Sequence, residues 1–158
     1  MLVILEQYLE RLTEQHQLLE ATLAGLPAEA LDWTPGADMN SLCVQVVHVA
    51  GSTRFWVGDV AAGIPSNRDR DAEFTAKGLD EETLKLRLTD TRTFVRSILE
   101  NLSLDELAEV RPVPGRRTAN GEQQTDTVGR ALLHALDHTA LHVGHAQMTR
   151  QLWDQQHV

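Results

Sequence analysis

The chain of 158 residues carries 14 basic and 23 acidic side chains, which give a formal net charge of −9, and 42% of its residues are hydrophobic. This composition is typical of a folded globular chain, and the length predicts one domain over residues 1–158. The acidic balance argues against a nucleic-acid-binding protein, because phosphate binding depends on basic residues. No apolar run approaches the ~20 residues of a membrane-spanning helix. We therefore expect neither nucleic acid nor a membrane as a partner.

The N-terminal stretch MLVIL is short and lacks the basic flank and the cleavage site of a signal peptide. Cys43 is the single cysteine, so no disulfide can form within the chain. Both features suit a reducing, cytoplasmic location. Cys43 lies about 140° around its predicted helix from His48, so a shared site for the two is not expected. A small buried residue is the simpler interpretation of Cys43.

A first helix is predicted over residues 2–23, because leucines recur there at helical spacing. They are Leu5, Leu9, Leu12, Leu19 and Leu23. Gly25 and Pro27 end the helix. His16 lies between two glutamines on this helix, and we expect its side chain to be exposed.

A loop with one aromatic anchor, Trp33, precedes a second helix over residues 42–62. Asn40 or Ser41 could cap its first turn. Apolar residues occur on nearly every side of this helix, which predicts a central position. Residues 66–78 are polar and are interpreted as a linker.

A third helix is predicted over residues 80–101, followed by a short helical turn. Residues 111–125 contain prolines, glycines and an Asn-Gly pair, which indicate a loop or a small hairpin. A fourth helix runs from residue 126 or 127 to about residue 153. The sequence therefore predicts an all-α fold, a four-helix bundle, and the long linker between helices two and three allows a crossover.

Four of the seven histidines lie within one stretch of the fourth helix, at spacings of four, four and three residues: His134, His138, His142 and His145. With about 100° per residue, all four fall within a sector of about 80°. Leu141 and Met148 border this stripe, so we expect it to face inward.

Two histidines one turn apart can direct their imidazoles at one metal ion, but a further ligand is needed. His48 is the obvious candidate, because it lies between two valines in the middle of the second helix. A titratable ring there is costly without a partner. The alternative involves no metal. His48 would then be a core histidine bonded to a backbone carbonyl, and the histidines of the fourth helix would be a pair on a solvated face. Spacing alone leaves both interpretations open.

The segment HALDHTALHVGHAQM, residues 134–148, resembles the C-terminal signature of the DinB-like (YfiT-type) metalloenzymes of bacteria. In that family a helix carries two histidines separated by three residues, then a basic residue and a Gly-Gln pair. The segment LDWTPGADMNSLCVQVVHV, residues 31–49, resembles the family's Trp-x-Pro, Asn-Ser and later His pattern. The similarity extends over nearly the whole chain.

The resemblance implies a four-helix bundle with a three-histidine site for a divalent metal. Carried over by position, the ligands are His48, His138 and His142. His134 and His145 are then second donors beside the ligands, and His145 could compete as a ligand. Three positions depart from the family pattern, with Val143 for the basic residue, His145 for the glutamine and Leu141 for a further histidine.

An open three-histidine site suits Zn²⁺, Ni²⁺, Fe²⁺ or Mn²⁺. Relatives include transferases that use low-molecular-weight thiols such as bacillithiol or mycothiol, and a maleylpyruvate isomerase. The resemblance thus implies an S-transferase, often a homodimer, in which the metal activates a thiol against a small-molecule electrophile. One alternative is a metal-dependent hydrolase, which lacks an evident general base because Asp137 projects about 100° away from His138. Another is a non-enzymatic metal-binding protein of a stress response.

The remaining aromatic and basic residues have simpler interpretations. Trp33, Trp56 and Trp153 are expected to be core or interface anchors rather than cofactor contacts. Arg116 and Arg117 could contact an anionic thiol if their loop folds over the site, although a solvated loop is the simpler explanation.

Overall fold

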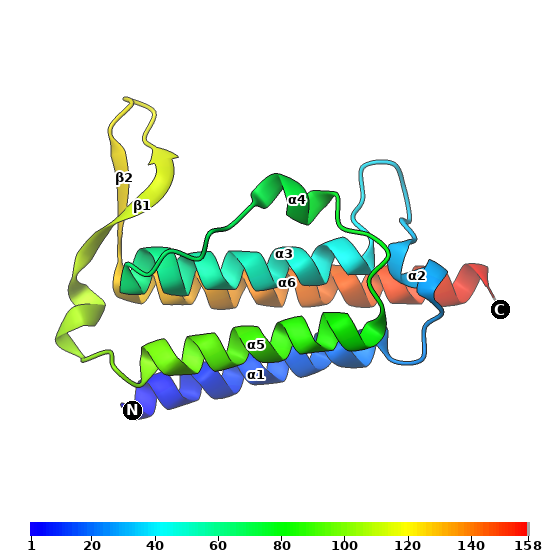
Figure 1. The fold of residues 1–158 in the computed structure, drawn as a ribbon, viewed down its shortest axis with the longest axis horizontal. Helices are drawn as coiled ribbons and strands as arrows, with labels where there is room; N and C mark the ends of the chain where they lie inside the picture. The colour runs from blue at the N-terminus through cyan, green and yellow to red at the C-terminus, as the bar shows by residue number, and fades with distance from the viewer. Residues whose placement is uncertain (158) are drawn as a thin grey trace.

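A computed structural model describes residues 1–157, in which four long helices pack side by side and a two-stranded hairpin stands at one end (Figure 1). The long helices are α1 (Val3–Leu23), α3 (Leu42–Arg54) with its π-helical continuation η1 (Phe55–Ala62), α5 (Glu81–Leu99) and α6 (Val128–Gln156). The shorter elements are α2 (Ala28–Asp32), α4 (Arg70–Phe74), the 3₁₀ turn η2 (Asp105–Ala108), β1 (Val110–Arg117) and β2 (Gln123–Thr127). The predicted four-helix bundle is confirmed, with helix ends close to those expected. No helix in the described part of the chain combines the length and apolar character needed to cross a bilayer.

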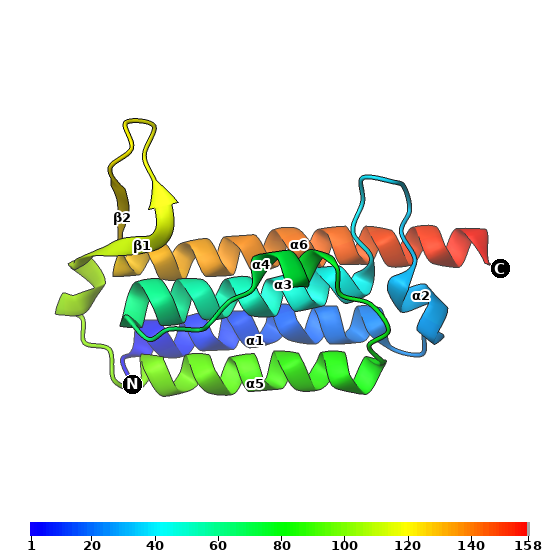
Figure 2. The ribbon, with the colours of Figure 1, turned by 45° about the horizontal axis from the view of Figure 1, so that its top comes forward.

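The bundle contains a crossover. Helices α1 and α6 run in one direction, whereas α3 and α5 both run in the other (Figures 1 and 2). Residues 63–80 therefore return along the length of the bundle before α5 begins, and they carry α4 across the outside of α3. The predicted polar linker is this crossover, but it is not featureless, because it folds into a short helix at its centre.

Side-chain caps fix the starts of three long helices. Ser41 accepts a hydrogen bond from the backbone N–H of Val44 at the start of α3. Asp80 and Thr127 cap α5 and α6 in the same way. Such caps satisfy N–H groups that have no partner within the helix. At the other end of the α3–η1 helix, Gly63 adopts a φ of 67° and closes the last turn.

The hairpin of β1 and β2 is antiparallel, and Val110 pairs with Thr127 at its base. Its tip is the predicted Asn-Gly turn, where Gly121 adopts a φ of 80° that favours glycine. Val113 is buried and anchors β1 on the bundle. At the opposite end of the bundle, Trp33 packs edge-on against Trp153 with ring centroids 5.6 Å apart, as expected of anchors.

A polar layer divides the core. One apolar cluster contains Leu5 to Leu12 of α1, and a second contains Leu19 and Leu23 of the same helix. Between the two clusters, each long helix contributes a buried polar side chain: His16 from α1, Thr53 from α3, Thr91 from α5 and Thr139 from α6. The hydroxyls of Thr53 and Thr139 lie 3.4 Å apart. The bundle interior is therefore polar at mid-height.

His16 is 0% exposed, so the prediction that it is exposed is wrong. It lies four residues after Leu12 and three before Leu19, on the face that α1 buries. Two flanking glutamines misled the interpretation, and one of them, Gln15, is buried as well. Burial, with the charge of Arg92 as a second cause, lowers the pKa of His16 from 6.5 to about 3.

This buried ring makes the fold sensitive to acid. The unfolded chain takes up a proton at His16 below pH 6.5, whereas the folded chain does not until about pH 3. The free energy of unfolding therefore decreases as the pH is lowered through this window. The expected loss from this residue is about 1.4 kcal/mol per pH unit. Urea unfolding of His16→Leu and the wild-type protein at pH 7.5, 6.5 and 5.5 measures it. Below pH 6.5 the free energy of unfolding of the wild-type protein should fall relative to that of the variant. A constant difference between the two proteins at all three pH values would contradict the assignment.

Candidate metal centre

Three histidines from two antiparallel helices converge on one point. His48 of α3 is 3% exposed, while His138 and His142, one turn apart on α6, are half-buried. One ring nitrogen from each lies within 4.8 Å of the other two. The Nε2 atoms of His48 and His138 are 3.1 Å apart. The structure thus brings together the three residues that the family resemblance selected.

Two hydrogen bonds between α3 and α6 bracket this point. Gln45 donates its amide N–H to the hydroxyl of Thr149 at 3.1 Å, one turn before His48. The contact between Thr53 and Thr139 lies beyond His48 on the other side. These pairs hold α3 and α6 at one axial position, which keeps the ring of His48 level with the two rings of α6.

The geometry fits a divalent transition metal. Two imidazole nitrogens that each lie 2.0–2.1 Å from one ion are separated by about 2.9–3.4 Å, depending on the coordination angle. The separation of 3.1 Å between His48 and His138 falls in this range. The donor set of three imidazoles is one that Zn²⁺ and its neighbours accept.

The rings of His138 and His142 are held in the neutral state that a metal requires. Burial lowers the pKa of His138 to about 3, and the charges of His142 and His48 add to this effect. Burial likewise lowers the pKa of His142 to about 4, with His48 as the second cause. A neutral imidazole keeps a free lone pair on one nitrogen. Both rings therefore remain potential ligands in mildly acidic solution.

A buried carboxylate orients His48. The Nδ1 atom of His48 lies 2.9 Å from Oε2 of Glu73, a residue of α4 that is 5% exposed. Arg68 donates two hydrogen bonds of 2.7 Å to the same carboxylate. Burial alone would raise the pKa of Glu73, but the hydrogen bonds from Arg68 and His48 lower it overall. An ionised carboxylate only accepts, so Nδ1 of His48 carries the proton and Nε2 is left for a metal.

The absence of a side chain at Gly51 makes room for this carboxylate. A Cβ atom at Gly51 would lie 1.9 Å from Oε1 of Glu73. Gly51 follows His48 by three residues and therefore lies on a neighbouring part of the same helix face. The glycine allows Glu73 to approach the backbone of α3 closely enough to reach the ring of His48.

The histidine stripe does not face the core, in contrast to the prediction. Helix α6 buries a face of mostly small residues, such as Ala131, Ala135 and Ala146. The stripe lies beside this face, so Leu141 and Met148 are exposed. The point where the three rings converge is consequently near the surface between α3 and α6, and the rings of His138 and His142 are only half-buried.

The other two histidines of the stripe, His134 and His145, are exposed and lie outside the group of three nitrogens. The ring of His134 lies 6.0 Å from that of His138, and His145 lies 5.6 Å from His142. His134 also contacts Trp56, with ring centroids 4.1 Å apart. Neither residue forms a hydrogen bond to a ligand ring within the described chain, so their predicted role as second donors remains a prediction.

Cys43 and Asp137 lie away from this point. Cys43 is fully buried in the apolar cluster near the start of α3, and burial raises the pKa of its thiol. The simple interpretation of Cys43 as a small core residue agrees with this environment. Asp137 is exposed on α6, as its angular position predicted.

Arginines surround the outer side of the site. The guanidinium carbon of Arg116, on β1, lies 4.9 Å from the ring of Trp56. That of Arg70 lies 5.0 Å from Phe74, whose ring is 4.8 Å from His48. Burial lowers the pKa of Arg116, and the nearby charges of Arg70 and Arg68 lower it further. Together Arg68, Arg70 and Arg116 form what we call the arginine rim.

Of Arg116 and Arg117, the two arginines that could contact an anionic thiol, only Arg116 belongs to the arginine rim. Arg116 lies over the ring of Trp56, which in turn contacts His134. Arg117 is exposed and donates instead to the carbonyl of Gly121 within the hairpin. The two neighbours point to different places because successive residues of a strand face opposite sides.

Sequence reasoning missed Glu73 and Arg68, which both come from the crossover. A weak signal exists, since Asp69 caps α4 by accepting a hydrogen bond from Ala72, and such a pattern marks a helix start. Nothing in the sequence distinguishes Glu73 from the other acidic residues as the one that is buried. The buried position of His48 predicts a partner for its ring, and the structure supplies Glu73 in addition to the candidate metal.

The role of Glu73 in metal binding can be tested by a substitution at Gly51, which leaves space for its carboxylate. Gly51→Ala should displace Glu73 from His48 and weaken Zn²⁺ binding about 10–100-fold, the usual effect of losing such a partner. Glu73→Gln should weaken it similarly. Gly144→Ala is the matched control, because a Cβ at this helical glycine meets nothing within 4 Å. Competition titration with a chromogenic chelator measures the three affinities, and equal affinities for Gly51→Ala and Gly144→Ala would contradict this role of Glu73.

Solved structures share this fold at low sequence identity. A conserved protein from Enterococcus faecalis is 17% identical with a TM-score of 0.71, and the match covers 96% of this chain and 98% of that one. A DinB-like protein from Bacillus subtilis is 15% identical with a TM-score of 0.67, and the match covers 96% and 93%. A mutant of the mycothiol-dependent maleylpyruvate isomerase is 13% identical with a TM-score of 0.63, covering 89% of this chain and 59% of that one. At these identities the likeness shows the fold alone.

No curated protein sequence matches this chain. The family model of the DinB superfamily matches residues 11–146, a span that begins in α1 and includes His48, His138 and His142. Because this match extends over most of the chain, the protein belongs to the DinB superfamily.

Proposed function

We propose that this protein binds a divalent transition metal through His48, His138 and His142 and uses it to activate a low-molecular-weight thiol, of the bacillithiol or mycothiol type, for transfer to a small electrophile. The observation that carries the proposal is the convergence of three ring nitrogens within 4.8 Å. The buried carboxylate behind His48 adds to it, since metal-bound histidines commonly donate their second N–H to such a group.

The three imidazoles would occupy part of the coordination shell of a metal and leave positions for a substrate. A bound Zn²⁺, Ni²⁺, Fe²⁺ or Mn²⁺ would act as a Lewis acid that lowers the pKa of a thiol or water. Glu73 fixes the orientation of His48, while His138 and His142 are half-buried and open to the outside. Structural metal sites are closed, so this access supports a site that works on a substrate.

The arginine rim supports an anionic reaction partner. Arg70 and Arg116 have no carboxylate within ion-pair distance in the part of the chain described, although the protein as a whole is acidic. Each guanidinium instead lies over an aromatic ring beside the histidines. A carboxylate or phosphate on the thiol or on the electrophile would give these cations a partner.

The choice of a thiol over water follows from what the residues around the histidines can do. Hydrolysis would need a general base near the metal, but Glu73 is already bonded to His48 and Arg68. Asp137 is exposed on another face of α6. A thiol that ionises on binding needs no such base. The name of one structural relative, a mycothiol-dependent isomerase, is consistent with thiol chemistry in this fold.

The ligand assignment predicts a sharp division among the histidines of α6. His48→Ala, His138→Ala and His142→Ala should each lose bound metal, whereas His134→Ala and His145→Ala should retain it. Elemental analysis of untagged protein, followed by titration with Co²⁺ and Zn²⁺, measures both stoichiometry and affinity. Metal loss in His145→Ala together with retention in His142→Ala would contradict the assignment and make His145 the ligand.

The arginine rim predicts selectivity for charge. Co²⁺-loaded protein should bind 3-mercaptopropionate about 10-fold or more tightly than 3-mercapto-1-propanol, since one hydrogen bond to a charged group contributes about 1.5–3 kcal/mol. The visible spectrum of Co²⁺ reports binding of either thiol. Arg116→Gln should reduce the preference, and Arg117→Gln, its neighbour on the same strand, should leave it intact. Spectra unchanged by both thiols would contradict the thiol proposal, whereas equal affinities would contradict only the role of the rim.

A further inference from the structure

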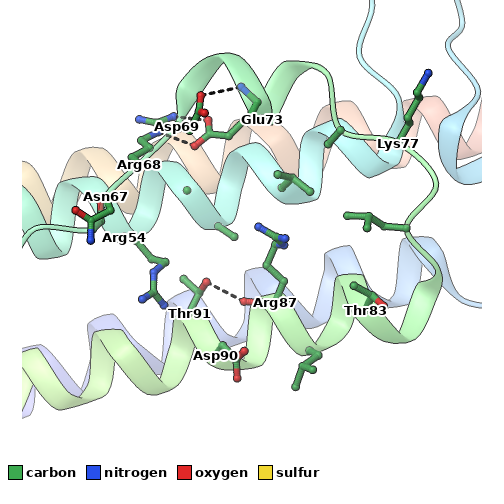
Figure 3. Close-up of a pocket in the computed structure, with 18 residues that line it drawn as sticks. Arg54, Asn67, Arg68, Asp69, Glu73, Lys77, Thr83, Arg87, Asp90 and Thr91 are labelled. Atoms are coloured by element: carbon green, nitrogen blue, oxygen red, sulfur yellow. Dashed lines mark hydrogen bonds and ion pairs between the residues drawn. The ribbon is translucent and has the colours of Figure 1, made fainter.

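A cavity of about 750 Å³ lies between α3, the crossover and α5 (Figure 3). Glu73 and Arg68 form part of its wall, but none of the three candidate ligand histidines lines it. The cavity therefore lies apart from the point where the three histidine rings converge. It shares Gly51, Arg68 and Glu73 with the surroundings of His48.

Cations dominate the unpaired charges of this cavity. Arg54, Lys77 and Arg87 line it, and none has a carboxylate within 4.0 Å in residues 1–157. Of the acidic residues in the wall, Glu73 is bonded to Arg68 and Asp69 caps α4. Three unpaired cations and one remaining carboxylate, Asp90, share the space in a protein whose net charge is −9.

Two of these cations approach the same space from opposite walls. Arg54 extends from α3 and Arg87 extends from α5 into the gap between the two helices (Figure 3). The guanidinium of Arg54 lies 4.2 Å from the centre of the Phe94 ring, which holds it beside the cavity. Ser66 adds a hydroxyl that is buried and has no hydrogen-bond partner in the described residues. These groups are donors suited to an oxyanion.

Apolar side chains also line the cavity. Val47 lines it from α3, two turns of helix before Arg54, and Leu79 lines it just before α5 begins. Leu86 also lines it and is 58% exposed, an unusual position for a large apolar side chain beside a cavity. Leu86 directly precedes Arg87, and Leu79 lies two residues after Lys77, so apolar and cationic side chains lie next to each other along the cavity.

We propose that this cavity binds a small amphipathic anion. A carboxylate or phosphate group would lie between Arg54 and Arg87, and an apolar chain would cover Val47, Leu79 and Leu86. The two arginines complement the negative charge of the head group. Burial of the exposed Leu86 side chain favours binding of the apolar chain. The site does not depend on the metal or on the thiol reaction, since its residues differ from the histidines and from the arginine rim except for Arg68.

Four probes test the two ends separately. Isothermal titration of the full-length protein compares hexanoate, hexyl phosphate, inorganic phosphate and neutral hexan-1-ol. We expect hexanoate or hexyl phosphate to bind at least 10-fold more tightly than both hexan-1-ol and inorganic phosphate. Preference between the first two identifies the head group as carboxylate or phosphate. Equal binding of hexyl phosphate and inorganic phosphate, without binding of hexanoate, would overturn the apolar end of the site.

Variants at the cationic end test the location. Arg54→Gln and Arg87→Gln should each weaken binding at least 10-fold, with unchanged circular dichroism as the check on folding. Arg96→Gln is the matched control, because Arg96 forms no ion pair within residues 1–157 and lies on the opposite face of α5, outside the cavity. Amide chemical-shift changes should cluster in residues 47–54 and 66–91. Absence of saturable binding by either anion, equal binding in all three variants, or shifts confined to residues 134–145 would overturn the proposal.

Discussion

The hydrogen bond from His48 to Glu73 determines which nitrogen of a buried ring is free to act as a ligand. A buried imidazole in the middle of an apolar helix needs a fixed partner, and an ionised carboxylate provides one only if its own charge is balanced. Arg68 balances it with two short hydrogen bonds, and Gly51 leaves the space in which the carboxylate sits. The orientation of His48 therefore depends on three residues that are not themselves ligands.

Topology supplies this partner. Since α3 and α5 are parallel neighbours, the chain between them must travel the length of the bundle, and residues 63–80 do so across the outside of α3. That path carries Glu73 to one side of His48, while α6 presents His138 and His142 on another. The same segment forms one wall of the cavity between α3 and α5. A simple up-down bundle with short connections would have neither the carboxylate nor the cavity.

The four long helices and the histidine triad could be predicted from the sequence, because both depend on spacing within one helix and on a family pattern. Local spacing does not say which neighbour a helix face meets, so the stripe was expected to point inward although small residues beside it form the buried face. For the same reason His16 was misassigned: its two glutamine neighbours are visible in the sequence, whereas the helices packed around it are not. Glu73 escaped prediction because its burial arises only from the crossover.

The buried polar layer sets the axial alignment of the whole bundle. If α1 slid by one turn along its neighbours, His16 would enter an apolar cluster and a leucine would take its place in the polar layer. The pairing of Thr53 with Thr139 applies the same constraint to α3 and α6. An apolar core would tolerate such sliding more readily. The polar layer thus fixes the position of each helix along its neighbours. Residues that are not candidate ligands therefore help to bring imidazole rings on two separate helices to the same height.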